Sequence, residues 1–164
     1  MEHTCCFFGH RKIEFTRERE ETLRAIIGNL VLEHDVNTFL FGSKSEFDDL
    51  CHTVVSDLKE NYPHLKRIYV RAEFPYISKQ YESHLLEWCE ETYFPEKILN
   101  AGKSVYIKRN YEMIDRSRFC VVYFDENYAP AKHGKPTGTK SGTKLAYDYA
   151  LRKKKTVINL LEDD

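Results

Sequence analysis

Three glycine-bearing loops hold the residues whose types and spacing suit ligand chemistry. They are Gly9-His10-Arg11-Lys12, Gly42-Ser43-Lys44-Ser45 and Gly138-Thr139-Lys140-Ser141-Gly142-Thr143. Glycine lets the backbone approach a ligand closely, cationic side chains pair with phosphate, and the free N–H groups of a helix N-terminus favour an anion. The loops therefore predict a binding site for a phosphate-bearing ligand.

Each loop also admits a structural interpretation. The first suits an exposed turn, and Ser45 with Asp48 has the spacing of a helix capping box. Asp48 would repel a phosphate, so a sugar hydroxyl is its better partner. The third loop lacks the P-loop spacing, and Gly9 does not begin a G-x-G-x-x-G fingerprint. These features leave ligand contact and helix capping open at both of the later loops.

Two acids are candidates for catalysis. Asp125 follows an apolar strand directly, where it would accept ribose hydroxyls, act as a general base or cap a turn. Asp48 is the second candidate. Asp115 lies close to Arg109 and Arg116 and is expected to anchor its helix by an ion pair.

Alternating strands and helices must position these loops. Apolar, β-prone runs predict strands at 4–8, 38–41, 67–70, 119–124 and 156–160. Helical periodicity predicts helices that begin after Thr16, Ser45 and Ser78, a short helix at 108–118, and a last helix after the third loop. The helix after Ser78 is expected to carry Trp88 and Cys89 and to break at 93–95, and residues 72–107 are otherwise unassigned. The order predicts a single α/β domain over 1–164: a Rossmann-like three-layer sandwich with a mainly parallel sheet, 119–124 at its centre and helices on both faces.

The composition excludes several classes of protein. The 25 basic and 26 acidic residues give a net charge of −1, so the chain has no field that would attract a polyanion, and nucleic acid is not an expected partner. The 5 cysteines form no C-x-x-C pair, so we expect neither a metal site nor a cofactor, and free thiols suit a reducing compartment. No run of about 18 apolar residues occurs, which predicts a cytoplasmic protein without a membrane span.

Four short motifs occur in an order that is similar to a known family. They are Gly9-His10-Arg11, Phe41-Gly42-Ser43 with Phe47-Asp48, Lys108-Arg109-Asn110 with Met113-Ile114-Asp115, and Ser141-Gly142-Thr143. The set resembles the SLOG superfamily of Rossmann-like domains, which includes the DprA and LOG proteins, and most of all its YpsA-like branch. The resemblance runs from about residue 4 to 160 and implies a pocket for a nucleotide or nucleotide derivative.

The chain also departs from that family. LOG-type phosphoribohydrolases resemble it at Gly142-Thr143 but carry, three residues later, a glutamate that assists N-glycosidic cleavage, where this chain has Ala146. The nearest acid, Asp148, lies four residues after Lys144 and is expected to form a surface pair with it. Ser43 stands where related loops often have a second glycine.

Binding or sensing of a nucleotide-type ligand, such as ADP-ribose or a nucleoside monophosphate, is the leading functional hypothesis. The alternative is an N-glycosidase that acts on nucleoside monophosphates or nucleotide sugars, with Asp125 or Asp48 in place of the missing glutamate. Single-stranded DNA binding is the weakest hypothesis, because it needs a basic groove lined with aromatic side chains. Tyr123, Tyr128 or Tyr147 would stack on the single base of a nucleotide ligand instead. We expect a homodimer. The predicted ligand-binding residues are Gly9, His10, Arg11, Gly42, Ser43, Ser45, Asp48, Arg109, Asp125, Ser141, Gly142 and Thr143.

Overall fold

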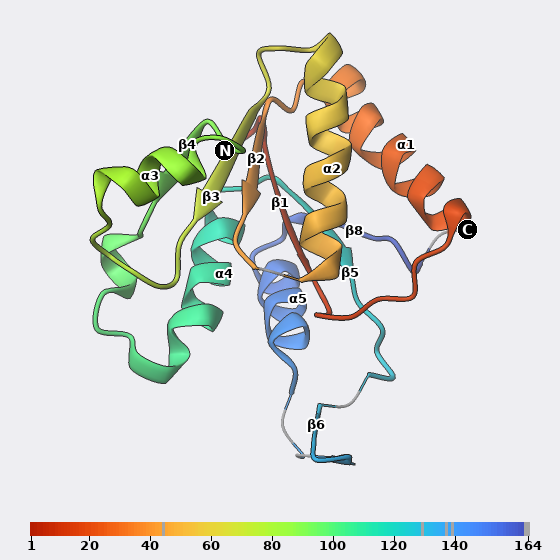
Figure 1. Cartoon of the computed structure of the whole chain (residues 1–164). Helices are drawn as coiled ribbons and strands as arrows, with labels where there is room; N and C mark the ends of the chain where they lie inside the picture. Colours follow the sequence, from red (N-terminus) through yellow and green to blue (C-terminus); the bar gives the residue numbers. More distant parts are fainter. Residues whose placement is uncertain (44, 129, 137, 139, 163–164) are drawn as a thin grey trace.

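A parallel six-stranded sheet forms the centre of the computed structural model, which describes residues 1–43, 45–128, 130–136, 138 and 140–162 (Figure 1). The strand order is β4-β3-β2-β1-β5-β8, and every neighbouring pair is parallel. Its strands are β1 (Thr4–Gly9), β2 (Thr38–Phe41), β3 (Lys66–Val70), β4 (Glu91–Tyr93), β5 (Phe119–Tyr123) and β8 (Thr156–Asn159).

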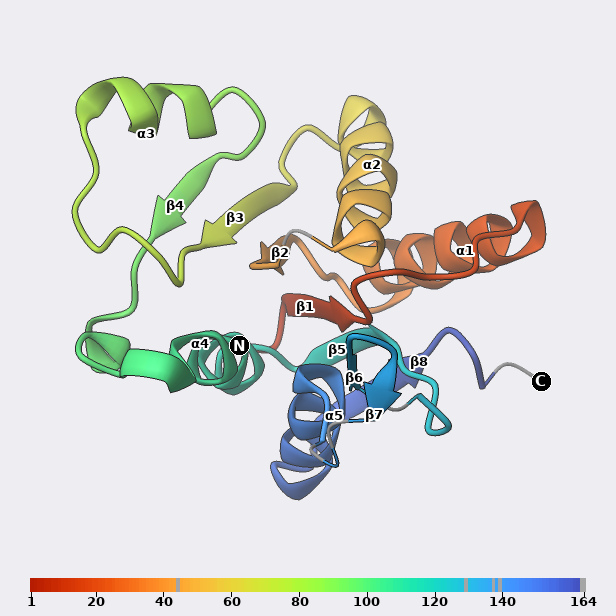
Figure 2. The same ribbon diagram turned by 60° about the horizontal axis from the view of Figure 1, so that its bottom comes forward.

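Helices cover both faces of this sheet (Figure 2). The helices are α1 (Arg17–Glu33), α2 (Glu46–Asn61), α3 (Lys79–Leu85), α4 (Val105–Asp115) and α5 (Gly142–Arg152). Successive side chains of a strand point to opposite faces. Cys5 and Phe7 of β1 therefore pack in a cluster with α1 and α2, whereas Cys6 and Phe8 pack in a second cluster with α4 and α5. The expected three-layer α/β architecture is confirmed.

The helix starts follow the expected capping chemistry. The side chains of Thr16, Ser45, Ser78 and Ser141 each accept the backbone N–H three residues later. This hydrogen bond satisfies one of the N–H groups that a helix leaves free at its N-terminus. The predicted caps at Thr16, Ser45 and Ser78 are therefore confirmed.

The middle of the chain differs from the expectation. The helix after Ser78 ends at Leu85, before Trp88 and Cys89, and a short edge strand, β4, follows it. Two 3-10 turns, η1 (Glu96–Ile98) and η2 (Gly102–Ser104), then lead into α4, which begins three residues before the predicted position. The three residues of β4 are too few to show an alternation of apolar and polar side chains. The strand forms because it pairs with β3, which the local sequence does not reveal.

Two further predictions need correction. The segment between β5 and α5, where no strand was predicted, contains a small hairpin of β6 (Ala131–Lys132) and β7 (Lys135–Pro136). The buried strand β5 is an interior strand, but β1 and β2 occupy the centre of the sheet.

The strand order places a topological switch point beside β1. From β1 the chain builds the sheet outwards through β2, β3 and β4, and then returns to add β5 and β8 on the other side. The loops that follow β1 and β5 therefore leave the sheet in opposite directions and open a crevice at the carboxyl ends of these strands. Ligands of open α/β sheets bind in such crevices.

Candidate functional site

A cleft of about 550 Å³ occupies this switch point. Loops far apart in the sequence meet there, together with one side chain from α4. Its lining residues are Gly9, His10, Arg11, Ser43, Ser45, Asn110, Tyr128, Ser141, Gly142 and Thr143. Gly42 lines a neighbouring cleft, and Lys44 and Thr139 of the predicted loops lie outside the described residues. The structure thus brings residues of all three loops together. We call this cavity the main cleft.

The first loop presents a buried histidine and an exposed arginine to the main cleft. His10 is only 4% exposed, and its Nε2 accepts the backbone N–H of Asp125 at 3.0 Å. Burial lowers the pKa of His10, so the ring is neutral near pH 7 and carries its proton on Nδ1. Tyr128 stacks on this ring, with 4.2 Å between the ring centroids. Arg11 is exposed and lines both the main cleft and its neighbour, so it is the cation available to a ligand.

Gly9 is also required by packing. A Cβ atom at this position would lie 2.7 Å from Cδ2 of Phe47, a fully buried side chain. The absence of a side chain therefore lets α2 pack closely against the end of β1.

The second loop is organised around the buried carboxylate of Asp48. Its Oδ2 accepts the backbone N–H groups of Gly42 at 3.2 Å and Ser43 at 3.1 Å. Ser45 Oγ accepts the backbone N–H of Asp48, as a cap should. Burial raises the pKa of Asp48 to about 6, against the hydrogen bonds and Arg109, which favour its charged form. Two N–H groups of the second loop thus already bind an anion from within the protein.

The third loop leaves its backbone donors available. Ser141 Oγ accepts the N–H of Lys144, but the N–H groups of Gly142 and Thr143 have no acceptor among the residues that the structure describes. Gly142 is exposed, and a Cβ atom there would meet no heavy atom within 4 Å. The N-terminus of α5 therefore opens onto the main cleft with free donors and free space.

Arg109 supports the second loop from the opposite face of the sheet. Its side chain is buried, and its guanidinium donates to the carbonyl oxygen of Gly42. A Cβ atom at Gly42 would lie 2.7 Å from Cδ of Arg109. Arg109 lines the neighbouring cleft of about 340 Å³ with Arg11, Ser43, Tyr69, Ala72, Glu73 and Tyr106. This neighbouring cleft adjoins the main cleft, because Arg11 and Ser43 line both.

The other predicted acids do not line the main cleft. Asp125 is exposed, and its Oδ1 accepts the N–H of Asn127 at 2.9 Å, which caps a turn. Asp148 pairs with Lys144 at 3.0 Å, as expected. Asp115 does anchor its helix by an ion pair, but the partner is Lys97 at 3.4 Å and not the arginines close to it in sequence.

Two lining residues, Asn110 and Tyr128, were not among the predicted contacts. Asn110 belongs to the motif Lys108-Arg109-Asn110, and this motif was the sequence signal that could have identified it as a lining residue. Of the three tyrosines considered for base stacking, only Tyr128 lines the main cleft. Tyr123 is buried, and Tyr147 stacks on Phe124.

Within the described ranges, no group of three or more His, Cys, Asp or Glu side chains is arranged to hold a metal ion. No helix in the same ranges has the length and apolar character that a membrane span needs. The five cysteines are free and buried. Comparison of the chain with protein-family models and with curated proteins gives no match.

Proposed function

We propose that this protein binds a nucleotide or nucleotide-derived ligand, such as ADP-ribose or a nucleoside monophosphate, in the main cleft. The observation that carries the proposal is the meeting of all three loops in one cavity at the topological switch point. The volume of about 550 Å³ lies within the range of small-molecule sites. The resemblance to the SLOG superfamily points to the same class of ligand.

The N-terminus of α5 supports the assignment of a phosphate to this cleft. The free N–H groups of Gly142 and Thr143 and the helix dipole favour a negative charge, and the exposed Arg11 supplies a cation. The second loop plays a different part, because Asp48 already occupies its donors. In this proposal the phosphate lies against the third loop, and the second loop is a rigid wall.

The lining favours binding over hydrolysis. None of the described residues that line the main cleft is an aspartate or a glutamate. The carboxylate of Asp48 is turned into its own loop, and that of Asp125 caps a turn. N-glycosidic cleavage needs a general base or a group that stabilises the sugar cation, so binding or sensing is the function that this cleft supports better.

A thermal-shift screen with AMP, ADP, ADP-ribose, NAD and related nucleotides tests the proposal. A nucleotide at about 100 times its dissociation constant stabilises the folded state by about 2.7 kcal/mol, which is a measurable shift for this size of domain. The best nucleotide is then titrated calorimetrically into Gly142→Val. The valine fills the open space above α5, so we expect loss of binding with about 1 kcal/mol or less change in stability.

The matched control is Gly28→Val, since Gly28 lies in α1 and also has open space where a Cβ would stand. This control should bind as the wild type does. Unchanged affinity in a folded Gly142→Val protein would show that the third loop is only a helix cap.

A further inference from the structure

A third cavity, of about 460 Å³, lies on the α2 side of the sheet, beyond the ends of β2 and β3. Aromatic and apolar side chains form most of its wall, and α3 closes one side. Its lining residues are Phe41, Ser43, Asp48, Asp49, His52, Tyr69, Tyr81, His84, Leu85 and Trp88. We call it the aromatic pocket. It adjoins the other two clefts through Ser43, which lines all three.

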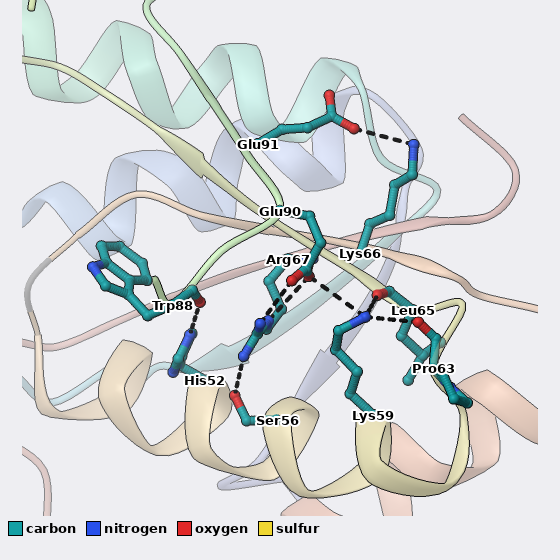
Figure 3. A network of polar contacts seen from close by, with 10 residues as sticks. All are labelled: His52, Ser56, Lys59, Pro63, Leu65, Lys66, Arg67, Trp88, Glu90 and Glu91. Atoms are coloured by element: carbon teal, nitrogen blue, oxygen red, sulfur yellow. Dashed lines mark hydrogen bonds and ion pairs between the residues drawn. The ribbon is translucent and has the colours of Figure 1, made fainter. Parts of the chain in front are cut away.

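The wall that carries Trp88 belongs to no helix or strand, yet polar contacts hold it firmly (Figure 3). His52 Nε2 lies 2.7 Å from the carbonyl oxygen of Trp88, and because a carbonyl only accepts, this nitrogen carries the proton. Two residues further on, Glu90 forms a bidentate pair with Arg67, with distances of 3.0 and 2.7 Å. Arg67 also donates to Ser56 of α2. These bonds tie the loop between α3 and β4 to α2 and β3, so the pocket is preformed.

Asp49 and Ser43 offer hydrogen-bond acceptors to a ligand in the aromatic pocket. The carboxylate of Asp49 is exposed and has no hydrogen-bond or ion-pair partner in the described part of the chain. Ser43 Oγ donates its proton to Ser45 and keeps a lone pair as an acceptor. No lysine or arginine is among the described lining residues. This chemistry disfavours a phosphate and favours a flat ring that carries N–H donors.

We infer that the aromatic pocket binds a purine base with an exocyclic amino group, as in guanine or adenine. The ring stacks among Tyr69, Tyr81 and Trp88, and its amino group donates to Asp49. The inference rests on the proposed function, because it assigns this pocket to the base and the main cleft to the phosphate of one ligand. Ser43, at the junction of the clefts, lies beside the path between the two ends.

The fluorescence of Trp88 tests the inference directly, since the chain contains a single tryptophan. Guanosine, adenosine and uridine lack a phosphate and therefore probe the pocket alone. We expect the two purine nucleosides to quench Trp88 saturably, and uridine to bind about tenfold or more weakly because it offers less stacking area and no amino group. Absence of saturable quenching by either purine nucleoside, or equal binding of uridine, would overturn the inference.

The variant Asp49→Asn removes the acceptor charge at the mouth of the pocket. We expect it to bind guanosine about tenfold or more weakly, as the loss of a charge-assisted hydrogen bond predicts. Glu60→Gln, an equal change of charge at an exposed position near the end of α2, is the control and should bind as the wild type does. Equal affinities in Asp49→Asn and the wild type would contradict the role of Asp49.

Comparison of guanosine with GMP, in the wild type and in Gly142→Val, separates the two proposals. If only the base site exists, both compounds quench Trp88 equally and Gly142→Val changes neither. If only the phosphate site exists, GMP raises the melting temperature of the wild type but not of Gly142→Val, and no nucleoside changes Trp88 emission. If both exist, GMP binds more tightly than guanosine, and Gly142→Val removes only this difference.

Discussion

Replacement of Asp48 by asparagine should change how the stability of the protein depends on pH. The side chain is 2% exposed, and one of its oxygens, Oδ2, accepts both loop N–H groups. Asparagine has nearly the same shape, and its single carbonyl oxygen can accept both loop N–H groups, while its amide stands where Oδ1 accepts the long bond of 3.5 Å from Ser45. The substitution therefore keeps both loop hydrogen bonds and removes the buried charge, together with one long bond from Ser45.

The magnitude follows from the pKa of Asp48, which burial raises from 3.8 to about 6. Between these values the folded state binds a proton that the unfolded state releases. The contribution of this group to stability is therefore fully present below pH 3.8 and is lost as the pH rises through about 6. A shift of about two pKa units corresponds to roughly 3 kcal/mol. Asp48→Asn has no such loss, so it gains about that much relative to the wild type across the window.

Urea unfolding of both proteins, at a series of pH values from about 4 to 7, measures the difference in the free energy of unfolding. Other acids titrate in the same range, but they cancel in the difference. Glu60→Gln, at an exposed position on the same helix, is the control and should follow the wild type closely. Parallel curves for Asp48→Asn and the wild type would refute the raised pKa and, with it, the account of the second loop.

Three other predictions concern packing, the aromatic pocket and catalysis. Gly9→Ala should lower the free energy of unfolding by about 1–3 kcal/mol, because its Cβ collides with Phe47, and Phe47→Leu in the same chain should recover part of the loss in urea unfolding. Glu90→Gln should lower the free energy of unfolding by about 2 kcal/mol, because it weakens the pair with Arg67. Limited proteolysis should then cut residues 86–90 faster, and an unchanged rate would mean that the network does not hold this loop. Incubation with AMP should release free base far more slowly than about 1 per second, as followed by chromatography, since no described lining residue of the main cleft is a carboxylate. Faster release that Asp125→Asn abolishes would reverse the ranking of the two functions.

The sequence alone determined the class of fold and the places where a ligand site should be sought. The buried run of β5, the one-faced periodicity of α1 and the caps at Thr16 and Ser45 are all encoded within a few neighbouring residues. Because side-chain period and capping are local, such patterns can be read from one chain. They also place the three glycine loops after strands or before helices, and thus near one edge of the sheet.

Only the tertiary structure decided what those loops do. The carboxylate of Asp48 could face a ligand or its own loop, and the choice depends on how α2 packs against the end of β2. The contact of His10 with Asp125 joins residues 115 positions apart, and no local pattern signals it. The same is true of the aromatic pocket, because Trp88 enters it through a loop that Arg67 and Glu90 hold in place. Contacts of this kind depend on strand order and on packing between distant segments, so they exist only once the whole sheet has assembled.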